Sequence, residues 1–241
     1  MNDTIIVIPV RLKATRFPNK PFAKIDNIPM LHYVFNTASK YFSNVYLAIC
    51  DQEVLDYCNN NNLAYVSTNP DHVSGTDRIG EAIDQLEKKL DFKFVINLQG
   101  DMPFIKKEYV ESLRKNLSSF KMSTLACSFR NKEEAENPSK VKVEIEEGKN
   151  IIAKDFSRRL KDITMLNKTI FHHIGVYGFQ KQFLKDYISQ EPSQREMEEK
   201  LEQLRVSENT EISITLVDQE ILGVDTKEDL DRVNHLIQDN E

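Results

Sequence analysis

The sequence has little glycine, no tryptophan and no long apolar run. Only 7 of its 241 residues are Gly, and none of these builds a Walker A loop, a G-x-G-x-x-G turn or a G-x-S-x-G elbow. The longest apolar stretches, such as 5–10, are far shorter than a transmembrane helix, and the first residues lack the pattern of a signal peptide. We therefore expect no membrane insertion and none of the chemistries that those glycine motifs serve.

Cysteine is also scarce. Cys50, Cys58 and Cys127 have no metal-ligand spacing and leave one thiol over, which predicts reduced structural thiols in a cytoplasmic protein. The 32 basic and 38 acidic side chains give a net charge of −6, which disfavours general binding to nucleic acid or to anionic membranes. With 40% hydrophobic and 29% charged residues, the composition is that of an ordinary globular protein.

Strand and helix patterns alternate in the first half. Expected strands lie at 4–10, 45–50, 63–66 and 92–98, and expected helices at 30–42, 51–58 and about 79–90. This alternation predicts an α/β fold with a doubly wound, mostly parallel sheet. Ligands of such sheets bind beyond the carboxyl ends of the strands, so the segments after Val10, Val66 and Leu98 are the ones to search.

The second half has a different pattern. Residues 140–146 alternate apolar and polar side chains, Glu147-Gly148 is a turn signal, and 150–156 can return as a partner strand, which predicts a small antiparallel lobe. Further expected elements are strands at 171–179 and 212–217 and helices opening at Ser193 and Thr226. We expect one α/β domain over 1–241, with 1–130 and 131–220 as parts of different character.

A basic loop follows the first expected strand. Five basic residues fall within the fourteen positions 11–24, and no acid lies between Asp3 and Asp26; they are Arg11, Lys13, Arg16, Lys20 and Lys24. Arg forks and Lys ammonium groups suit the oxygens of a polyphosphate. The alternative is a solvated basic loop.

Two carboxylates lie at the ends of expected elements, one after a strand and one beside a helix start. Asp101 lies in the segment 97–103 directly after the fourth strand, and Asp225 lies beside the start of the last helix. Mg²⁺ prefers one or two protein carboxylates together with substrate phosphates, so the pair could hold this ion. Each Asp could instead serve only to cap a helix or close a turn.

Three further segments carry polar side chains. Ser74 to Arg78 opens an expected helix, where backbone amides could receive an anion or a base edge, although Thr76 is also a sufficient cap. The neighbours His172 and His173 alternate within an apolar strand, which is more typical of packed than of catalytic histidines. Residues 202–205 are expected on an exposed helix face, with Glu198 and Glu202 on one side.

Six segments follow one another along the chain, beginning with the basic loop. The others are SGTDRI (74–79), NLQGDMP (97–103), HHIGVYGF (172–179), LEQLR (201–205) and GVDTKEDL (223–230). Together they resemble the 3-deoxy-manno-octulosonate (Kdo) cytidylyltransferase family, whose fold is that of the nucleotide-diphospho-sugar transferases. The resemblance implies the reaction of CTP and Kdo to CMP-Kdo and pyrophosphate with Mg²⁺. It also implies a homodimer built by the second-half lobe, and a part in making lipopolysaccharide or another Kdo-containing glycan.

The resemblance also implies residue roles. The CTP phosphates would be held by Arg11, Arg16 and Lys20, and the base and ribose would lie by Ser74, Gly75 and Arg78. Mg²⁺ would be bound by Asp101 and Asp225, which with the three basic residues would form the catalytic set. The sugar acid would be bound by Gln99, Arg158, His173, Tyr177, Glu202 and Gln203. In this scheme 1–130 mainly binds nucleotide, and 131–220 mainly binds sugar and forms the dimer.

Three departures from the family pattern leave alternatives open. Ala14 stands where the family usually has Ser, and Met102 stands where it usually has an acid. The segment between Arg158 and Phe171 is shorter than is typical of the family. The alternatives are a cytidylyltransferase for another keto-acid sugar, such as 8-amino-Kdo or a sialic-acid-like sugar, and a non-catalytic nucleotide-binding homologue.

Overall fold

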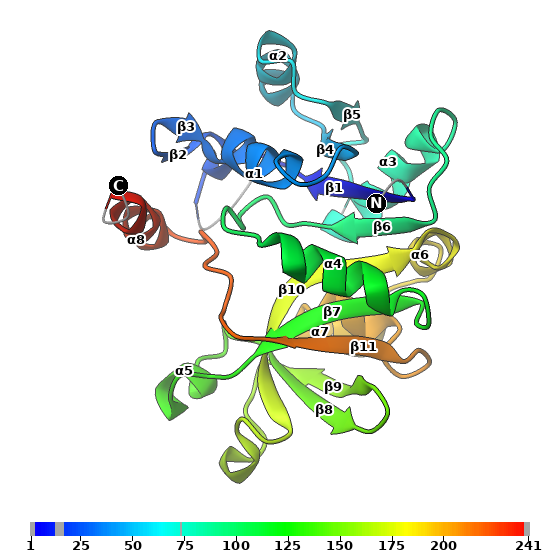
Figure 1. Cartoon of the computed structure of the whole chain (residues 1–241), viewed down its shortest axis with the longest axis vertical. Coiled ribbons are helices and arrows are strands. Elements are labelled where there is room, and N and C mark those ends of the chain that lie inside the picture. The colour runs from blue at the N-terminus through cyan, green and yellow to red at the C-terminus, as the bar shows by residue number, and fades with distance from the viewer. Residues whose placement is uncertain (1–2, 13–16, 73, 239–241) are drawn as a thin grey trace. The chain divides into compact units, whose positions relative to one another are not determined.

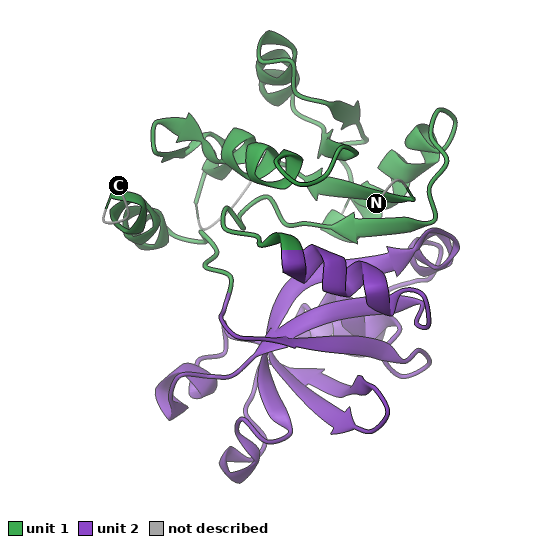
Figure 2. Ribbon diagram, in the orientation of Figure 1, with its two compact units in different colours: residues 1–107, 221–241 green, residues 108–220 purple. Residues whose placement is uncertain are grey.

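The computed structural model describes residues 3–12, 17–72 and 74–238 (Figure 1). The chain divides into two compact units: Met1–Lys107 with Ile221–Glu241, and Glu108–Glu220 (Figure 2). The change from one unit to the other comes well before residue 130, because helix α4 (Lys107–Asn116) packs with strands of the second unit. Asn116 Nδ2 donates to Thr215 Oγ1 at 3.0 Å, and Ser123 Oγ donates to Leu113 O at 3.1 Å.

The first unit contains a parallel sheet with strand order β5-β4-β1-β6. The strands are β1 (Thr4–Pro9), β4 (Val45–Ile49), β5 (Tyr65–Ser67) and β6 (Phe94–Asn97), and each neighbouring pair runs parallel. The β-branched run of β1 is buried, and β1 is an inner strand with β4 paired at one edge and β6 at the other. These strands lie where the sequence predicts them, with ends that differ by a few residues.

Helices α1 (Met30–Ser39), α2 (Gln52–Asn60), α3 (Gly75–Leu86) and α8 (Lys227–Gln238) complete the first unit. The helical spacing of Ile79, Ile83 and Leu86 gives α3 one buried face, as predicted. Short elements η1 (Lys20–Phe22), β2 (Lys24–Ile25) and β3 (Ile28–Pro29) precede α1. The β2–β3 turn is bonded to Asn234 of α8, whose side chain accepts from Asp26 N and donates to Lys24 O.

The second unit is a sheet that closes on itself. Its order is β10-β7-β11-β9-β8, and β8 also pairs with β10. The strands are β7 (Met122–Cys127), β8 (Lys142–Glu147), β9 (Ile151–Ser157), β10 (Ile170–Gln180) and β11 (Ile212–Val217). The expected β8–β9 hairpin is present and antiparallel, but β11 runs parallel to β7. The lobe is thus mixed, where the sequence predicts an antiparallel one.

Short helices line the second unit: α5 (Lys132–Glu136), η2 (Ile163–Met165), α6 (Lys181–Ile188), α7 (Gln194–Glu199) and η3 (Glu202–Arg205). The predicted capping box of Ser193 and Glu196 opens α7. Across the described residues, no helix is both long and apolar enough to span a bilayer.

The expectation of an exposed helix at 202–205 is wrong. Helix α7 ends at Glu199, because Lys200 adopts a left-handed conformation with φ of 53°, and Glu202 belongs to a separate 3-10 turn. Glu198 and Glu202 therefore do not share a helix face. The turn is drawn inward by Arg205, whose guanidinium donates to both carboxylate oxygens of Glu196 at 2.9 and 2.7 Å in a buried pair.

Candidate active site

An open cleft of about 860 Å³ lies in the first unit at the carboxyl ends of β1 and β6. It contains charged side chains of both signs together with apolar walls. The lining residues are Pro9, Val10, Arg11, Phe17, Lys20, Pro21, Met30, Leu31, Gln99, Gly100, Asp101 and Asp225. The cleft is at the sheet edge where a parallel α/β fold binds ligands. It contains five of the site residues that the sequence predicts.

Lys20 links the two predicted metal ligands. Its Nζ donates to Asp101 Oδ2 at 2.7 Å and to Asp225 Oδ1 at 3.2 Å. The backbone around Lys20 is held by Asn19, which has a left-handed φ of 55°, and by the buried Pro21. Only 18% of the Lys20 side chain is exposed. Three residues that are far apart in the sequence thus meet at one ammonium nitrogen.

Asp101 is positioned by a close approach of backbone to backbone. A Cβ added to Gly100 would lie 3.1 Å from the carbonyl oxygen of Pro9, which is tighter than a side chain ordinarily tolerates. Glycine therefore lets the chain after β6 turn tightly against the end of β1. The turn is completed by Met102 N, which donates to Gln99 O at 3.2 Å.

Asp225 reaches the same point by a second backbone contact. Val224 N donates to the carbonyl oxygen of Asp101 at 2.9 Å, which joins the two carboxylate-bearing loops. The start of α8 is capped by its neighbours: Asp229 N donates to Thr226 Oγ1, and Asp229 Oδ2 accepts from Asp225 N and Thr226 N. Thr226 therefore caps the helix, while the Asp225 carboxylate contacts Lys20.

Lys20, Asp101 and Asp225 place two negative charges around one positive charge. Burial lowers the pKa of Lys20, but the charges and hydrogen bonds of Asp101 and Asp225 outweigh it, and the net effect raises that pKa above its ordinary value. Lys20 is thus an ammonium at neutral pH. Among the described residues no group of three or more His, Cys, Asp or Glu side chains could hold a metal. Two carboxylates fit Mg²⁺, which usually completes its shell with phosphate oxygens and water.

The predicted nucleotide residues have different surroundings. Arg11 is exposed at the cleft, and Arg16 lies outside the described residues. Gly75 opens α3 close to the cleft, since a Cβ there would lie 3.4 Å from Pro9 Cγ and 3.8 Å from Gln99 Oε1. Ser74 Oγ accepts from Asp77 N as the helix cap, so Ser74 rather than Thr76 caps α3.

Arg78 and Gln99 make internal contacts. Arg78 is only 3% exposed, and its Nη1 donates to Thr68 Oγ1 at 2.6 Å and to Asn69 O at 3.3 Å. It therefore holds the loop that follows β5. Gln99 Nε2 donates to Asn97 Oδ1 at 2.8 Å while Gln99 lines the cleft.

The second unit brings together three of the predicted sugar-binding residues. The rings of His173 and Tyr177 on β10 lie 5.5 Å apart, and the Tyr177 hydroxyl donates to Gln203 Oε1 at 2.9 Å. Gln203 is 2% exposed, and its Nε2 has no hydrogen-bond partner in the described part of the chain. An unsatisfied buried donor is costly in a folded protein, so this amide is suited to a ligand oxygen.

The cluster is uncharged at neutral pH. Burial lowers the pKa of His173 to about 3 and raises the pKa of Tyr177 well above its ordinary value. His173 Nε2 lies 3.0 Å from Thr124 Oγ1, a residue that the sequence analysis did not single out. Thr124 lies on β7, and no short motif in the sequence marks it. The cluster offers neutral donors and acceptors, which suit hydroxyl groups.

The Glu202 carbonyl and the Arg158 guanidinium both make hydrogen bonds within the second unit. The carbonyl oxygen of Glu202 accepts from the Tyr187 hydroxyl at 2.6 Å. The Arg158 guanidinium donates to three carbonyl oxygens, those of Pro138, Glu199 and Lys200. Arg158 therefore ties β9 to the end of α7.

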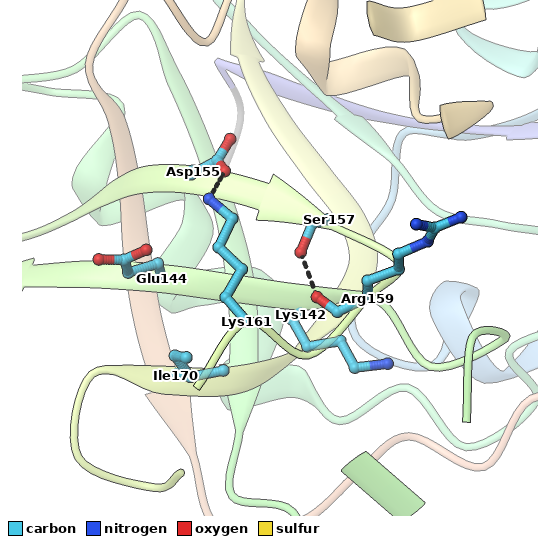
Figure 3. Close-up of a pocket in the computed structure, with 7 residues that line it drawn as sticks. All are labelled: Lys142, Glu144, Asp155, Ser157, Arg159, Lys161 and Ile170. Atoms are coloured by element: carbon cyan, nitrogen blue, oxygen red, sulfur yellow. Dashed lines mark hydrogen bonds and ion pairs between the residues drawn. The ribbon is translucent and has the colours of Figure 1, made fainter. Parts of the chain in front are cut away.

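A second, smaller pocket of about 200 Å³ lies in the second unit (Figure 3). Three of its charged side chains contact other residues of the unit: Asp155 pairs with Lys161 and with Arg195, and Lys142 Nζ donates to three carbonyl oxygens. These contacts already occupy Lys142, Asp155 and Lys161 within the protein. The larger cleft is therefore the better candidate for chemistry.

The comparisons with known proteins agree with this geometry. A family model described as cytidylyltransferase matches residues 5–214. This chain belongs to the cytidylyltransferase family. The matched range includes Lys20, Asp101 and the β10 cluster, whereas Asp225 lies eleven residues after its end.

Curated cytidylyltransferases match over nearly the whole chain. The 3-deoxy-manno-octulosonate cytidylyltransferase of Thermodesulfovibrio yellowstonii is 38% identical and covers 95% of both chains, and that of Paramagnetospirillum magneticum is 36% identical and covers 97% of both. A solved structure of CMP:2-keto-3-deoxy-manno-octonic acid synthetase complexed with CTP has a TM-score of 0.87 at 30% identity, and the match covers 99% of both chains. These relatives confirm the resemblance and an α/β fold with a mixed sheet.

Proposed function

We propose that this cytidylyltransferase couples CTP to Kdo and releases pyrophosphate. The observation that carries the proposal is the convergence of Lys20, Asp101 and Asp225 in the open cleft of the first unit. Curated relatives and a CTP-bound structural neighbour with this activity in their names support the choice of nucleotide and sugar.

The nucleotide triphosphate is bound in the cleft of the first unit. Arg11 and Lys20 neutralise its phosphates, with Arg16 of the same basic loop, and the start of α3 at Ser74 and Gly75 lies against the base and ribose. Arg78, in the first turn of α3, joins that helix to the loop after β5 by donating to Thr68. Basic side chains at the β- and γ-phosphates stabilise the charge of the departing pyrophosphate.

The chemical step is an in-line substitution at the α-phosphorus. The anomeric hydroxyl oxygen of Kdo forms the new P–O bond, the bond to the β-phosphate bridging oxygen breaks, and the hydroxyl proton leaves to solvent. Such a reaction depends on positioning and charge neutralisation, and it needs no covalent enzyme intermediate. Asp101 and Asp225 would hold Mg²⁺, which when bound neutralises phosphate charge and polarises the α-phosphate.

The sugar acid is recognised mainly by neutral hydrogen-bonding groups. Gln203 Nε2 supplies a donor that the described structure leaves unsatisfied, and His173 and Tyr177 lie beside it. Glu202 and Gln99 add polar side chains, and Arg158 remains a candidate for the sugar carboxylate if it leaves its carbonyl partners. A polyol with several hydroxyls requires this kind of lining.

Three wider features complete the proposal: a homodimer formed through the β-rich second unit, a cytoplasmic location, and a product used for lipopolysaccharide or another Kdo-containing glycan. The free cysteines Cys50, Cys58 and Cys127 are in keeping with a reducing compartment. Partly exposed apolar side chains on the β8–β9 hairpin are in keeping with a partner subunit.

The test is pyrophosphate release by the purified protein with CTP, Mg²⁺ and a panel of sugars: Kdo, 8-amino-Kdo and a sialic acid. ATP, GTP and UTP serve as nucleotide controls. Release with Kdo and CTP alone is the expected result. Release only with another sugar would keep the chemistry and change the substrate, and no release with CTP still bound would favour the non-catalytic alternative.

A further inference from the structure

Lys20 contacts both carboxylates that the proposed function assigns to the metal. Its Nζ lies 2.7 Å from Asp101 Oδ2 and 3.2 Å from Asp225 Oδ1. The exposed fractions of the three side chains rise from 18% for Lys20 to 26% for Asp101 and 49% for Asp225. The least exposed member of the trio is therefore the ammonium that lies between the two acids.

An ammonium in this position opposes a divalent cation. Like charges a few ångströms apart repel each other, and the repulsion is stronger at a partly buried site than in water. A carboxylate oxygen that already accepts a hydrogen bond from Lys20 is also a less available metal ligand. Without nucleotide, a metal ion must either displace the Lys20 ammonium or bind beside it.

Lys20 can change partners by moving its side chain alone. The backbone is fixed on both sides: Lys20 N donates to Phe17 O, Ala23 N donates to Lys20 O, and Pro21 is buried between them. The flexible side chain opens into the same cleft as Arg11, where a triphosphate has room to bind. Phosphate oxygens offer the ammonium anionic partners that replace the two carboxylates.

We propose that Lys20 is an exchangeable counter-ion that makes metal binding depend on nucleotide binding. The proposal rests on the proposed function, since it takes the cleft to be the site of a nucleoside triphosphate. When the nucleotide binds, the Lys20 ammonium transfers from Asp101 and Asp225 to the phosphates, and the carboxylates become available to the metal. Because such coupling is reciprocal, the metal also strengthens nucleotide binding through the same exchange.

The exchange has a measurable consequence in the protein without nucleotide. Replacing Lys20 by a neutral side chain removes the ammonium that contacts both Asp101 and Asp225. We expect Lys20→Met to bind Mn²⁺ at least about tenfold more tightly than the unmodified protein, within the usual range of coupling between sites. Lys20→Gln should give the same gain, which guards against a folding defect in either variant.

The measurement is Mn²⁺ titration followed by the electron paramagnetic resonance signal of the free ion, with no nucleotide present. Lys24→Met is the matched control, because Lys24 is an exposed lysine of the neighbouring strand β2 and is absent from the cleft. It should change Mn²⁺ affinity by less than about twofold.

Adding Asp101→Asn to Lys20→Met should abolish the gain. An Mn²⁺ affinity in Lys20→Met and Lys20→Gln no tighter than in the unmodified protein would overturn the proposal, as would a gain that survives Asp101→Asn.

A second titration in the presence of CTP separates this proposal from the proposed function. CTP should strengthen Mn²⁺ binding to the unmodified protein and to Lys24→Met more than it does in Lys20→Met. If CTP strengthens Mn²⁺ binding equally in all three, Lys20 does not couple the two ligands and the proposal fails. If the unmodified protein does not bind CTP, the proposed function fails, whereas the titration without nucleotide still decides whether Lys20 competes with the metal.

Discussion

Single residues without reactive groups determine the geometry of the cleft. Gly100 allows the chain after β6 to pass within a short distance of the end of β1, and the next residue is Asp101. Val224 contributes only a backbone N–H, which donates to the carbonyl of Asp101 and thereby brings Asp225 to Lys20. Positioning of this kind matters because a displacement of one ångström at a charged site is enough to slow a reaction strongly.

Replacement of Gly100 by Ala should reduce turnover by at least about tenfold, because the new methyl group meets the Pro9 carbonyl and moves Asp101. The free energy of unfolding should fall by about 1–3 kcal/mol, as for other insertions into tight packing. The measurements are pyrophosphate release and urea unfolding. Gly148→Ala is the control, since the nearest atom to its added Cβ is 3.9 Å away in the β8–β9 turn. Full activity in Gly100→Ala would show that the close approach is not needed.

Strand β10 illustrates what an element contributes beyond its residues. Its register against β7 shifts between Ile174 and Tyr177, and the Thr124 hydroxyl lies within 3.1 Å of the carbonyl oxygens of Ile174 and Val176 at this irregularity. The strand also buries two adjacent histidines, since burial lowers the pKa of His172 to about 4 and that of His173 to about 3. Both are therefore neutral in the folded protein across the physiological range.

The buried histidines predict an acid-sensitive stability. Between pH 6.5, the ordinary pKa of histidine, and about 4, the unfolded chain takes up a proton at His172 that the folded chain does not. The free energy of unfolding should therefore fall as the pH falls through this window, by up to about 1.4 kcal/mol per pH unit for each histidine. The free energy of unfolding, measured with urea across pH 4–7, should depend less steeply on pH in His172→Gln than in the unmodified protein. The difference should correspond to the uptake of up to one proton.

The matched control for this comparison is His235→Gln, because His235 is exposed on α8. Its slope should equal that of the unmodified protein. A His172→Gln slope that also equals it would mean that the imidazole of His172 titrates normally in the folded state.

At the scale of the molecule, the chain forms two units and returns to the first one at its end (Figure 2). This return supplies Asp225, so the carboxylate pair is assembled only after the second unit has been traversed. The second unit carries partly exposed apolar residues at the start of β9: Ile151, Ile152 and Ala153. Such residues at the end of a β-hairpin are typical of a surface that a partner covers.

Light scattering during size-exclusion chromatography should give a mass of twice 28.0 kDa. Ile151→Glu should shift the distribution toward a single chain, because a carboxylate opposes burial of this surface in a subunit interface. Lys149→Glu in the adjacent turn is the control, and it should leave the mass unchanged. A mass of one chain for the unmodified protein would contradict the homodimer.

The sequence alone determined much of the first unit and the location of its chemistry. The strands β1, β4, β5 and β6 follow from local apolar runs, because a buried parallel strand is marked by its own side chains. Their order along the chain with the intervening helices is enough to predict that Lys20 and Asp101 lie at one edge of the sheet. The motifs that resemble the Kdo cytidylyltransferases led to the family that the comparisons then confirmed.

Tertiary structure decided the rest, because the deciding contacts join residues far apart in the sequence. Strand β7 was not predicted from the sequence, because Ser123 and Thr124 make its sequence polar. These two side chains can be buried because they donate hydrogen bonds to Leu113 and to β10. Burial of Gln203 depends likewise on the Glu196–Arg205 pair that draws its turn inward. The placement of one ammonium between two carboxylates is a property of three converging loops, and no local pattern in the sequence determines how such loops meet.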